Sequence, residues 1–171
     1  MHVRTASLAA VVAALLAAPP ARAQDSGCSG KLSGAVEGTF DCKVAIDKGG
    51  AAGKISFVIT PAANVPGTRS FAPGDLELGG PLKTQTYTVR ALDRANASLT
   101  TSAGAAFTAT GGKHGKGEVT LNIAQAERYA QLRGRYVVNG SYQARLVPAA
   151  GAKEAEVVVD VQFTVATGVL D

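Results

Sequence analysis

The chain has 171 residues with 2 cysteines, no tryptophan and a formal net charge of +4. The first 23 residues have the pattern of a leader, and without them 148 residues remain, with 15 basic against 13 acidic side chains. So small an excess of positive charge excludes a dedicated nucleic-acid-binding protein, and 148 residues suffice for one domain with one hydrophobic core. We therefore predict a single domain at 24–171 and no nucleic-acid partner.

The leader has the three parts of a secretory signal peptide. A positively charged start precedes the apolar run Leu8–Ala18, and Ala21-Arg22-Ala23 forms an A-x-A cleavage site. The apolar run is too short for a membrane span, which needs about 20 residues. We predict a signal peptide at 1–23, export as a soluble protein to the periplasm or the extracellular space, and no transmembrane segment in the mature chain. Asp25-Ser26-Gly27 separate Cys28 from the apolar run, which weighs against a lipid anchor at this cysteine.

The clearest structural pattern lies at 31–47. Even-numbered positions from Leu32 to Ile46 are apolar, Gly or Cys, and the odd ones are mostly polar, which is the period of a half-buried strand. In an exported protein a cysteine pair favours a structural disulfide, and its alpha carbons must lie about 4.4–6.8 Å apart. An antiparallel register whose paired positions sum to 70 satisfies this for Cys28 and Cys42. We predict a disulfide-linked hairpin that turns at 34–36.

Short alternating segments separated by Gly and Pro continue to the end of the chain. We predict further strands at 54–60, around 76–78, at 84–91, near 99, and at 105–110, 118–123, 136–147 and 155–165. The segments 105–110 and 118–123 are expected to form a hairpin, and 124–133 favours a short connecting helix. Eight or nine short strands indicate an all-β fold: a single antiparallel β-sandwich, with a small β-barrel as the alternative.

A Gly-rich loop holds the one histidine that follows the leader. Lys113, His114 and Lys116 make it a candidate anion-contact loop, but Thr110 and Gly117 break the pattern of a phosphate-binding loop. A single histidine also cannot build a multi-histidine metal site. We predict no catalytic residue, no cofactor and no metal.

Arginines gather in one short part of the chain. Arg128, Arg133, Arg135 and Arg145 are a candidate surface contact patch for an envelope component or another anionic surface, such as lipid headgroups or an acidic polysaccharide. The absence of tryptophan weighs against a carbohydrate-binding module that stacks sugars on exposed rings.

Two acids and two asparagines complete the candidates. Asp75 and Glu77 could meet as a calcium site or a glycosidase pair, but acids two residues apart on an extended segment more often form a solvated face. Asn96 and Asn139 begin N-x-S sequons, which matter only in a eukaryotic secretory pathway.

These observations predict an exported, non-catalytic protein of the bacterial envelope with a binding or structural role. Two alternatives remain open. A carrier of a small apolar ligand or lipid requires an internal cavity of about 300 Å³ or more. A hydrolase of unrecognised type would use His114 or the pair Asp75 and Glu77.

Overall fold

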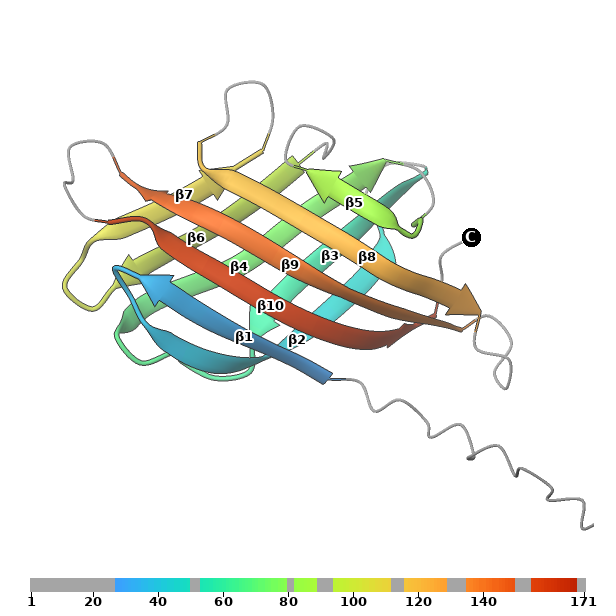
Figure 1. Cartoon of the computed structure of the whole chain (residues 1–171), viewed down its shortest axis with the longest axis horizontal. Coiled ribbons are helices and arrows are strands. Elements are labelled where there is room, and N and C mark those ends of the chain that lie inside the picture. The colour runs from blue at the N-terminus through green and yellow to red at the C-terminus, as the bar shows by residue number, and fades with distance from the viewer. Residues whose placement is uncertain are drawn as a thin grey trace, which may run out of the picture.

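The computed structural model describes residues 27–49, 53–79, 82–88, 94–111, 116–128, 135–149 and 155–168. In these residues all regular structure is β-strand, and every strand pairing is antiparallel (Figure 1). The strands are β1 (Gly27–Gly34), β2 (Gly38–Lys48), β3 (Lys54–Pro61), β4 (Thr68–Gly79), β5 (Gln85–Thr88), β6 (Arg94–Thr101), β7 (Ala106–Thr110), β8 (Glu118–Arg128), β9 (Tyr136–Pro148) and β10 (Val157–Thr167). The predicted all-β antiparallel class is confirmed.

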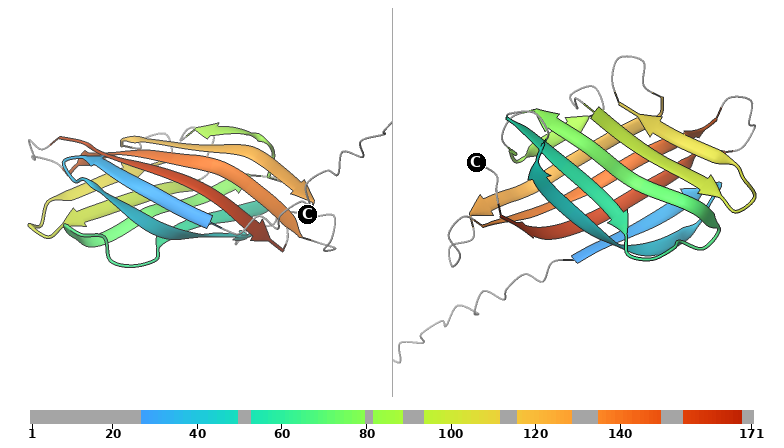
Figure 2. Two further views of the ribbon diagram at one scale, coloured as in Figure 1. Left: turned by 60° about the horizontal axis from the view of Figure 1, so that its bottom comes forward. Right: turned by 180° about the vertical axis from the view of Figure 1, so that it is seen from behind.

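Eight of the strands close into a barrel. The order β10-β1-β2-β3-β4-β6-β7-β9 returns to its start because β10 pairs with both β1 and β9. β8 and β5 continue the sheet from β9 beyond the ring. The barrel is flattened, with a front sheet of β5, β8, β9, β10 and β1 facing a back sheet of β3, β4, β6 and β7 (Figure 2). The barrel that the sequence left as an alternative is therefore the architecture, with the two facing layers of a sandwich.

Two corners join the sheets. β2 pairs with β1 through 38–41 and with β3 through 42–48, so one continuous strand makes the first corner. At the second corner β7 meets β9 only at Phe107↔Pro148 and Thr108↔Val147. The first corner therefore has more strand pairing than the second.

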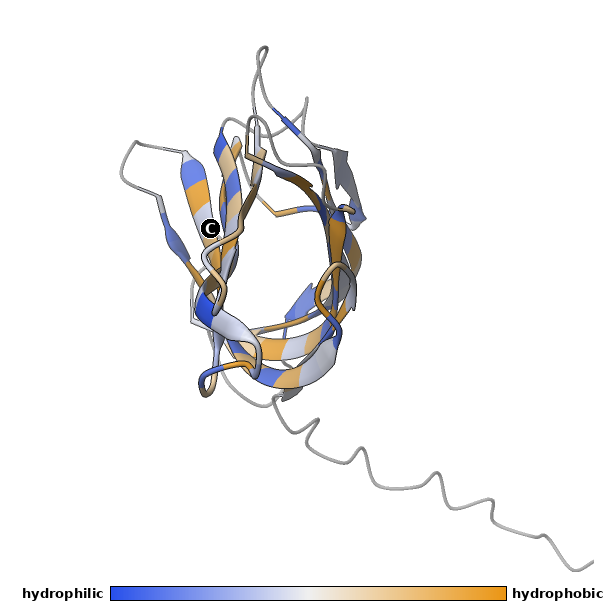
Figure 3. Ribbon diagram, turned by 90° about the vertical axis from the view of Figure 1, so that its left-hand side faces the viewer, coloured by the Kyte–Doolittle hydropathy of each residue, from blue (hydrophilic) through white to orange (hydrophobic). Residues whose placement is uncertain are grey.

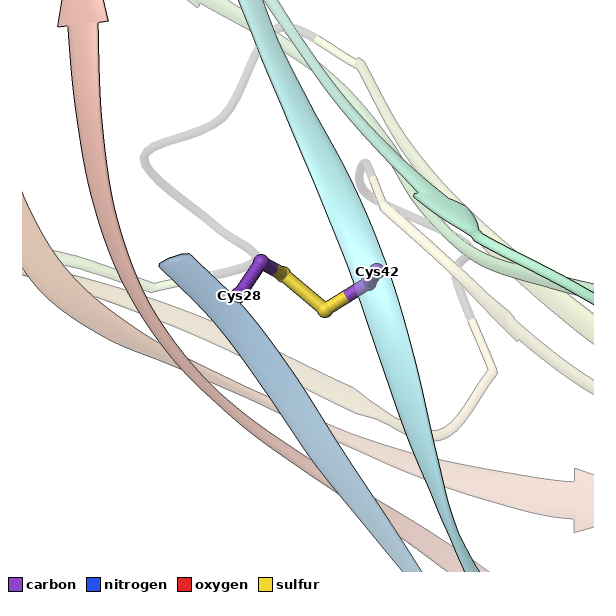
Figure 4. Close-up of a disulfide and its surroundings, with 2 residues drawn as sticks. All are labelled: Cys28 and Cys42. Carbon is purple, nitrogen blue, oxygen red and sulfur yellow. A yellow bond between two sulfur atoms is a disulfide. The ribbon is translucent and has the colours of Figure 1, made fainter. Parts of the chain in front are cut away.

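The N-terminal hairpin has the predicted register. Gly30 lies opposite Phe40, and the paired positions of β1 and β2 sum to 70 throughout. Cys28 and Cys42 form a disulfide with their alpha carbons 4.9 Å apart (Figure 4). Both the disulfide and the hairpin are confirmed, and the bond ties the first strand to the corner strand.

Replacing both Cys28 and Cys42 by Ser should lower the free energy of unfolding by about 3 kcal/mol, because the disulfide closes a loop of about 15 residues in the unfolded chain. For a domain of this size that corresponds to a fall in Tm of about 10 °C. Urea titration with and without reductant measures the effect. The urea midpoint of the double variant should be the same in both conditions. An unchanged urea midpoint for the reduced wild type would contradict it.

The interior is filled by the inward positions of the strands. Leu32, Phe57, Leu76 and Val159 are fully buried, and they come from β1, β3, β4 and β10. Figure 3 shows the resulting alternation of apolar and polar bands along the ribbons of the barrel wall. Since most inward side chains alternate with polar outward ones, the barrel has an apolar inside and a mainly polar outside.

Tyr142 ties the two sheets together across this interior. Its hydroxyl donates a hydrogen bond of 2.6 Å to the carbonyl oxygen of Pro73 on β4. The register of β4 with β6 shifts between Ala72 and Asp75, and Gly74 lies under the tyrosine ring, where a Cβ atom would come within 2.9 Å of it. Burial raises the pKa of Tyr142, so the hydroxyl remains protonated as the donor.

Tyr142→Phe should lower the free energy of unfolding by about 1–3 kcal/mol at pH 7, because it leaves the buried Pro73 carbonyl without its donor. A raised folded-state pKa contributes stability below the unfolded value of about 10 and loses it as the pH rises further. The wild type should therefore lose stability above pH 10 more steeply than the variant. Urea titration from pH 7 to 11 checks this, with Tyr136→Phe, at the half-buried start of β9, as control. Parallel pH profiles for wild type and Tyr142→Phe would contradict it.

Two local predictions are wrong. β7 and β8 do not form a hairpin, because their residues do not pair with each other; β7 pairs with β9 at 147–148 and β8 pairs with it at 136–145, as the chain crosses from the back sheet to the front sheet. The helix expected at 124–133 is absent from 124–128, which belong to β8, and the rest of that segment lies outside the described residues. Pairing of this segment with the start of β9 outweighs a weak helix propensity.

Candidate functional site

A row of polar side chains crosses the outer face of the front sheet. Neighbouring strands place these residues directly opposite one another, and consecutive strands lie about 4.8 Å apart, so the row is about 24 Å long. We call it the central row: Asp41, Ser29, Gln162, Ser141, Asn122 and Thr86. Every strand of the front sheet, together with the first part of β2, contributes one member.

A second polar row runs beside the central row, two residues away from it on each strand. It consists of Thr39, Lys31, Asp160, Gln143, Thr120 and Thr88. Both rows are dominated by amides and hydroxyls. On the outer face of the back sheet, Asp75 and Glu77 form ion pairs with Arg94 and Lys54.

The members of the central row other than Thr86 line an open, shallow hollow of about 640 Å³. Its lining includes the side chains of Ser29, Asn122, Asn139, Ser141 and Gln162 and a single ionised group, Asp41. A second hollow of about 410 Å³ adjoins it over β1, β2 and β10 and shares Ser29, Asp41 and Gln162 with the first. The two together form a continuous groove over the central row.

Internal hydrogen bonds order some of these polar groups. Thr86 Oγ1 donates to Asn122 Oδ1 at 3.1 Å, and Asn139 Nδ2 donates to Gln125 Oε1 at 2.7 Å. Among the described residues, Asn139 Oδ1 is a buried side-chain oxygen without a hydrogen-bond partner. Amide and hydroxyl groups that are held in place but incompletely paired provide donors and acceptors for a polar ligand.

The three members of the central row nearest the middle of the groove make no internal bonds. Within the described part of the chain, Ser29, Ser141 and Gln162 have no side-chain hydrogen bond. Ser29 and Gln162 are exposed, and Ser141 is half-buried between them and Asn122. Their hydrogen-bonding groups are therefore open to solvent or to a ligand.

The predicted arginine patch divides between two ends of the front sheet. Arg128 and Arg135 flank Tyr136 at one end, where Arg128 Nε donates to the Tyr136 hydroxyl at 3.2 Å. Arg145 lies nine residues further along β9, or about 30 Å away, with its Nε 3.6 Å from an oxygen of Glu156. Arg133 lies outside the described residues. The structure thus brings together Arg128 and Arg135 but not Arg145.

The other candidates occupy separate places. Lys113 and His114 lie outside the described residues, and Lys116 is exposed, with its backbone N–H donating to Thr110 Oγ1 at 3.1 Å. Asn96 is exposed on β6, whereas Asn139 is half-buried on the wall of the groove.

Asp75 and Glu77 each have a cation on a neighbouring strand. Asp75 Oδ1 lies 2.9 Å from Arg94 and Glu77 Oε1 lies 2.7 Å from Lys54. Among the described residues no group of three or more His, Cys, Asp or Glu side chains is arranged to hold a metal ion. This geometry supports the interpretation of the two acids as a solvated, ion-paired face.

Asp75→Asn should lower the free energy of unfolding by less than about 1 kcal/mol, because its partner Arg94 is half-exposed and solvent screens the pair. A double-mutant cycle with Arg94→Gln in urea measures the coupling between the two side chains. A loss of more than about 3 kcal/mol would contradict a surface role for this carboxylate.

Comparison with known proteins provides no identification. No protein-family model matches the chain, and no curated protein matches its sequence.

The central row was not predicted from the sequence. Only Asn139, which lies beside it, was named, as the start of a sequon. The signal was present, since the odd-numbered positions of β1 and β2 are mostly polar. The neighbours of each residue depend on the strand order β2-β1-β10-β9-β8-β5, which joins segments that are distant in the chain.

Proposed function

We propose that this chain is an exported, non-catalytic protein that binds a component of the bacterial envelope. In this proposal it holds its partner on the outer face of the front sheet. The central row carries the proposal: it is a polar surface that crosses six strands, lies in an open groove and contains side chains without internal hydrogen bonds.

Export is supported by the leader pattern and by the disulfide. Structural disulfides persist in oxidising compartments, and Cys28 and Cys42 are paired. The described residues contain no helix of the length and hydropathy that a membrane span requires. An envelope or extracellular location agrees with these observations.

A binding role is better supported than either alternative. An apolar carrier needs an interior space, whereas the ring of Tyr142 reaches across the barrel to Pro73, and Phe57 and Phe163 pack with their ring centroids 5.1 Å apart. A hydrolase based on Asp75 and Glu77 would need a site around them, and the structure gives each acid an ion-pair partner on the sheet surface.

The proposal predicts that the exported protein co-sediments with envelope fragments of the producing cell and that Ser141→Arg reduces the bound fraction at least fivefold. The substitution puts a long cation into the middle of the groove. Gln162→Lys, at an exposed site of the same row, should act in the same direction.

Asn96→Arg is the matched control, because it adds the same cation to the outer face of the back sheet. Circular dichroism and urea titration establish that each variant folds. If the wild type remains in the supernatant, or if the control loses as much binding as Ser141→Arg, the proposal is wrong.

A further inference from the structure

We propose that the groove over the central row binds an uncharged, hydroxyl-rich chain, that is, a neutral oligosaccharide or polysaccharide. This inference rests on the proposed binding role of the front sheet and adds the chemical class of the ligand. It depends on the functional groups that line the groove, on their charge and on the shape of the groove.

The lining offers groups that both donate and accept hydrogen bonds. The amides of Asn122, Asn139 and Gln162 and the hydroxyls of Ser29 and Ser141 line the larger hollow. A sugar hydroxyl also donates one hydrogen bond and accepts others, so it pairs with either end of an amide. An apolar ligand would remove these polar groups from water without pairing them, which is unfavourable.

The charge of the lining disfavours anions. Asp41 is the single ionised side chain among the residues that line the larger hollow, and its charge is negative. Lys31 lines the smaller hollow together with Asp41 and Asp160, so positive charge is outnumbered there as well. A phosphate or carboxylate group would be repelled, whereas a carboxylate such as Asp41 accepts hydrogen bonds from hydroxyl groups.

The shape suits a chain that lies across the strands. The two hollows share Ser29, Asp41 and Gln162 and are open rather than enclosed, so a ligand could extend past both ends of the contact. The central row places successive polar side chains on adjacent strands at a regular spacing of about 4.8 Å. A repeating polymer can contact such a regular row at several points.

Two internal features prepare the groove for such a ligand. The bond from Thr86 Oγ1 engages Asn122 Oδ1, so the Nδ2 group of this amide remains as a donor. The bond from Asn139 Nδ2 to Gln125 Oε1 holds a second amide in place on the wall of the groove. Phe163 lines the larger hollow and Phe40 the smaller one, but both rings are buried, so sugar binding here depends on hydrogen bonds more than on stacking.

The test is an NMR titration of the ¹⁵N-labelled, disulfide-bonded protein with cellohexaose, maltohexaose and fully N-acetylated chitohexaose, and with hexagalacturonic acid as the charged counterpart. At least one neutral hexasaccharide should shift the side-chain amide signals of Asn122 and Gln162 and the backbone signals around Ser141. Gln162→Ala should weaken the binding about fivefold, as the loss of one hydrogen bond predicts. Asn96→Ala, on the back sheet, should leave it unchanged.

Three results would overturn the inference: no shift with any neutral hexasaccharide, tighter binding of hexagalacturonic acid, or shifts confined to residues outside the groove. The envelope assay separates this failure from failure of the proposed function. If Ser141→Arg still abolishes co-sedimentation while no neutral sugar binds, the front sheet is the binding face but the ligand is of another class. If the wild type does not co-sediment, the binding role itself is wrong.

Discussion

The barrel depends on continuous backbone pairing around a closed ring. Buried backbone groups need hydrogen-bond partners, and closure gives every strand of the ring a neighbour on both sides. Two corners make this closure possible: β2 pairs with a different sheet in each half, and β7 meets the end of β9. The disulfide from Cys28 to Cys42 lies where β2 changes partners, so it stabilises the corner on which the N-terminal half depends.

Closure also determines which side chains lie next to one another on the outer surface. Once the apolar positions point inward, the outward positions of six neighbouring strands form one surface, and the central row is the result. On the outer face of the back sheet, Asp75 forms an ion pair with Arg94, and Glu77 forms one with Lys54. On the front sheet Ser29, Gln162 and Ser141 have no side-chain hydrogen bond within the described residues and line an open groove, which makes this sheet the candidate binding face.

Much of the fold follows from the period of the sequence. The alternation at 31–47 and the spacing of the two cysteines were enough to predict the first hairpin with its register, because a disulfide and a short turn leave one solution. The propensity of a segment was a poorer guide: 124–128 favours a helix in isolation but pairs with β9 in the barrel. The pairing of β7 with β8 was predicted wrongly, because nearness in the chain does not determine which sheet a strand joins.

The sequence by itself determined the all-β class, the disulfide and the inward or outward direction of most strand residues, since these depend on local period and on residue type. The tertiary structure alone decided that the strands close into a barrel, that Tyr142 meets Pro73, and that Ser29, Gln162 and Ser141 become neighbours. The physical reason is that side-chain direction repeats every two residues along one strand. The neighbours of a residue, by contrast, depend on which distant strands pair, and that choice is made by the packing of the whole interior.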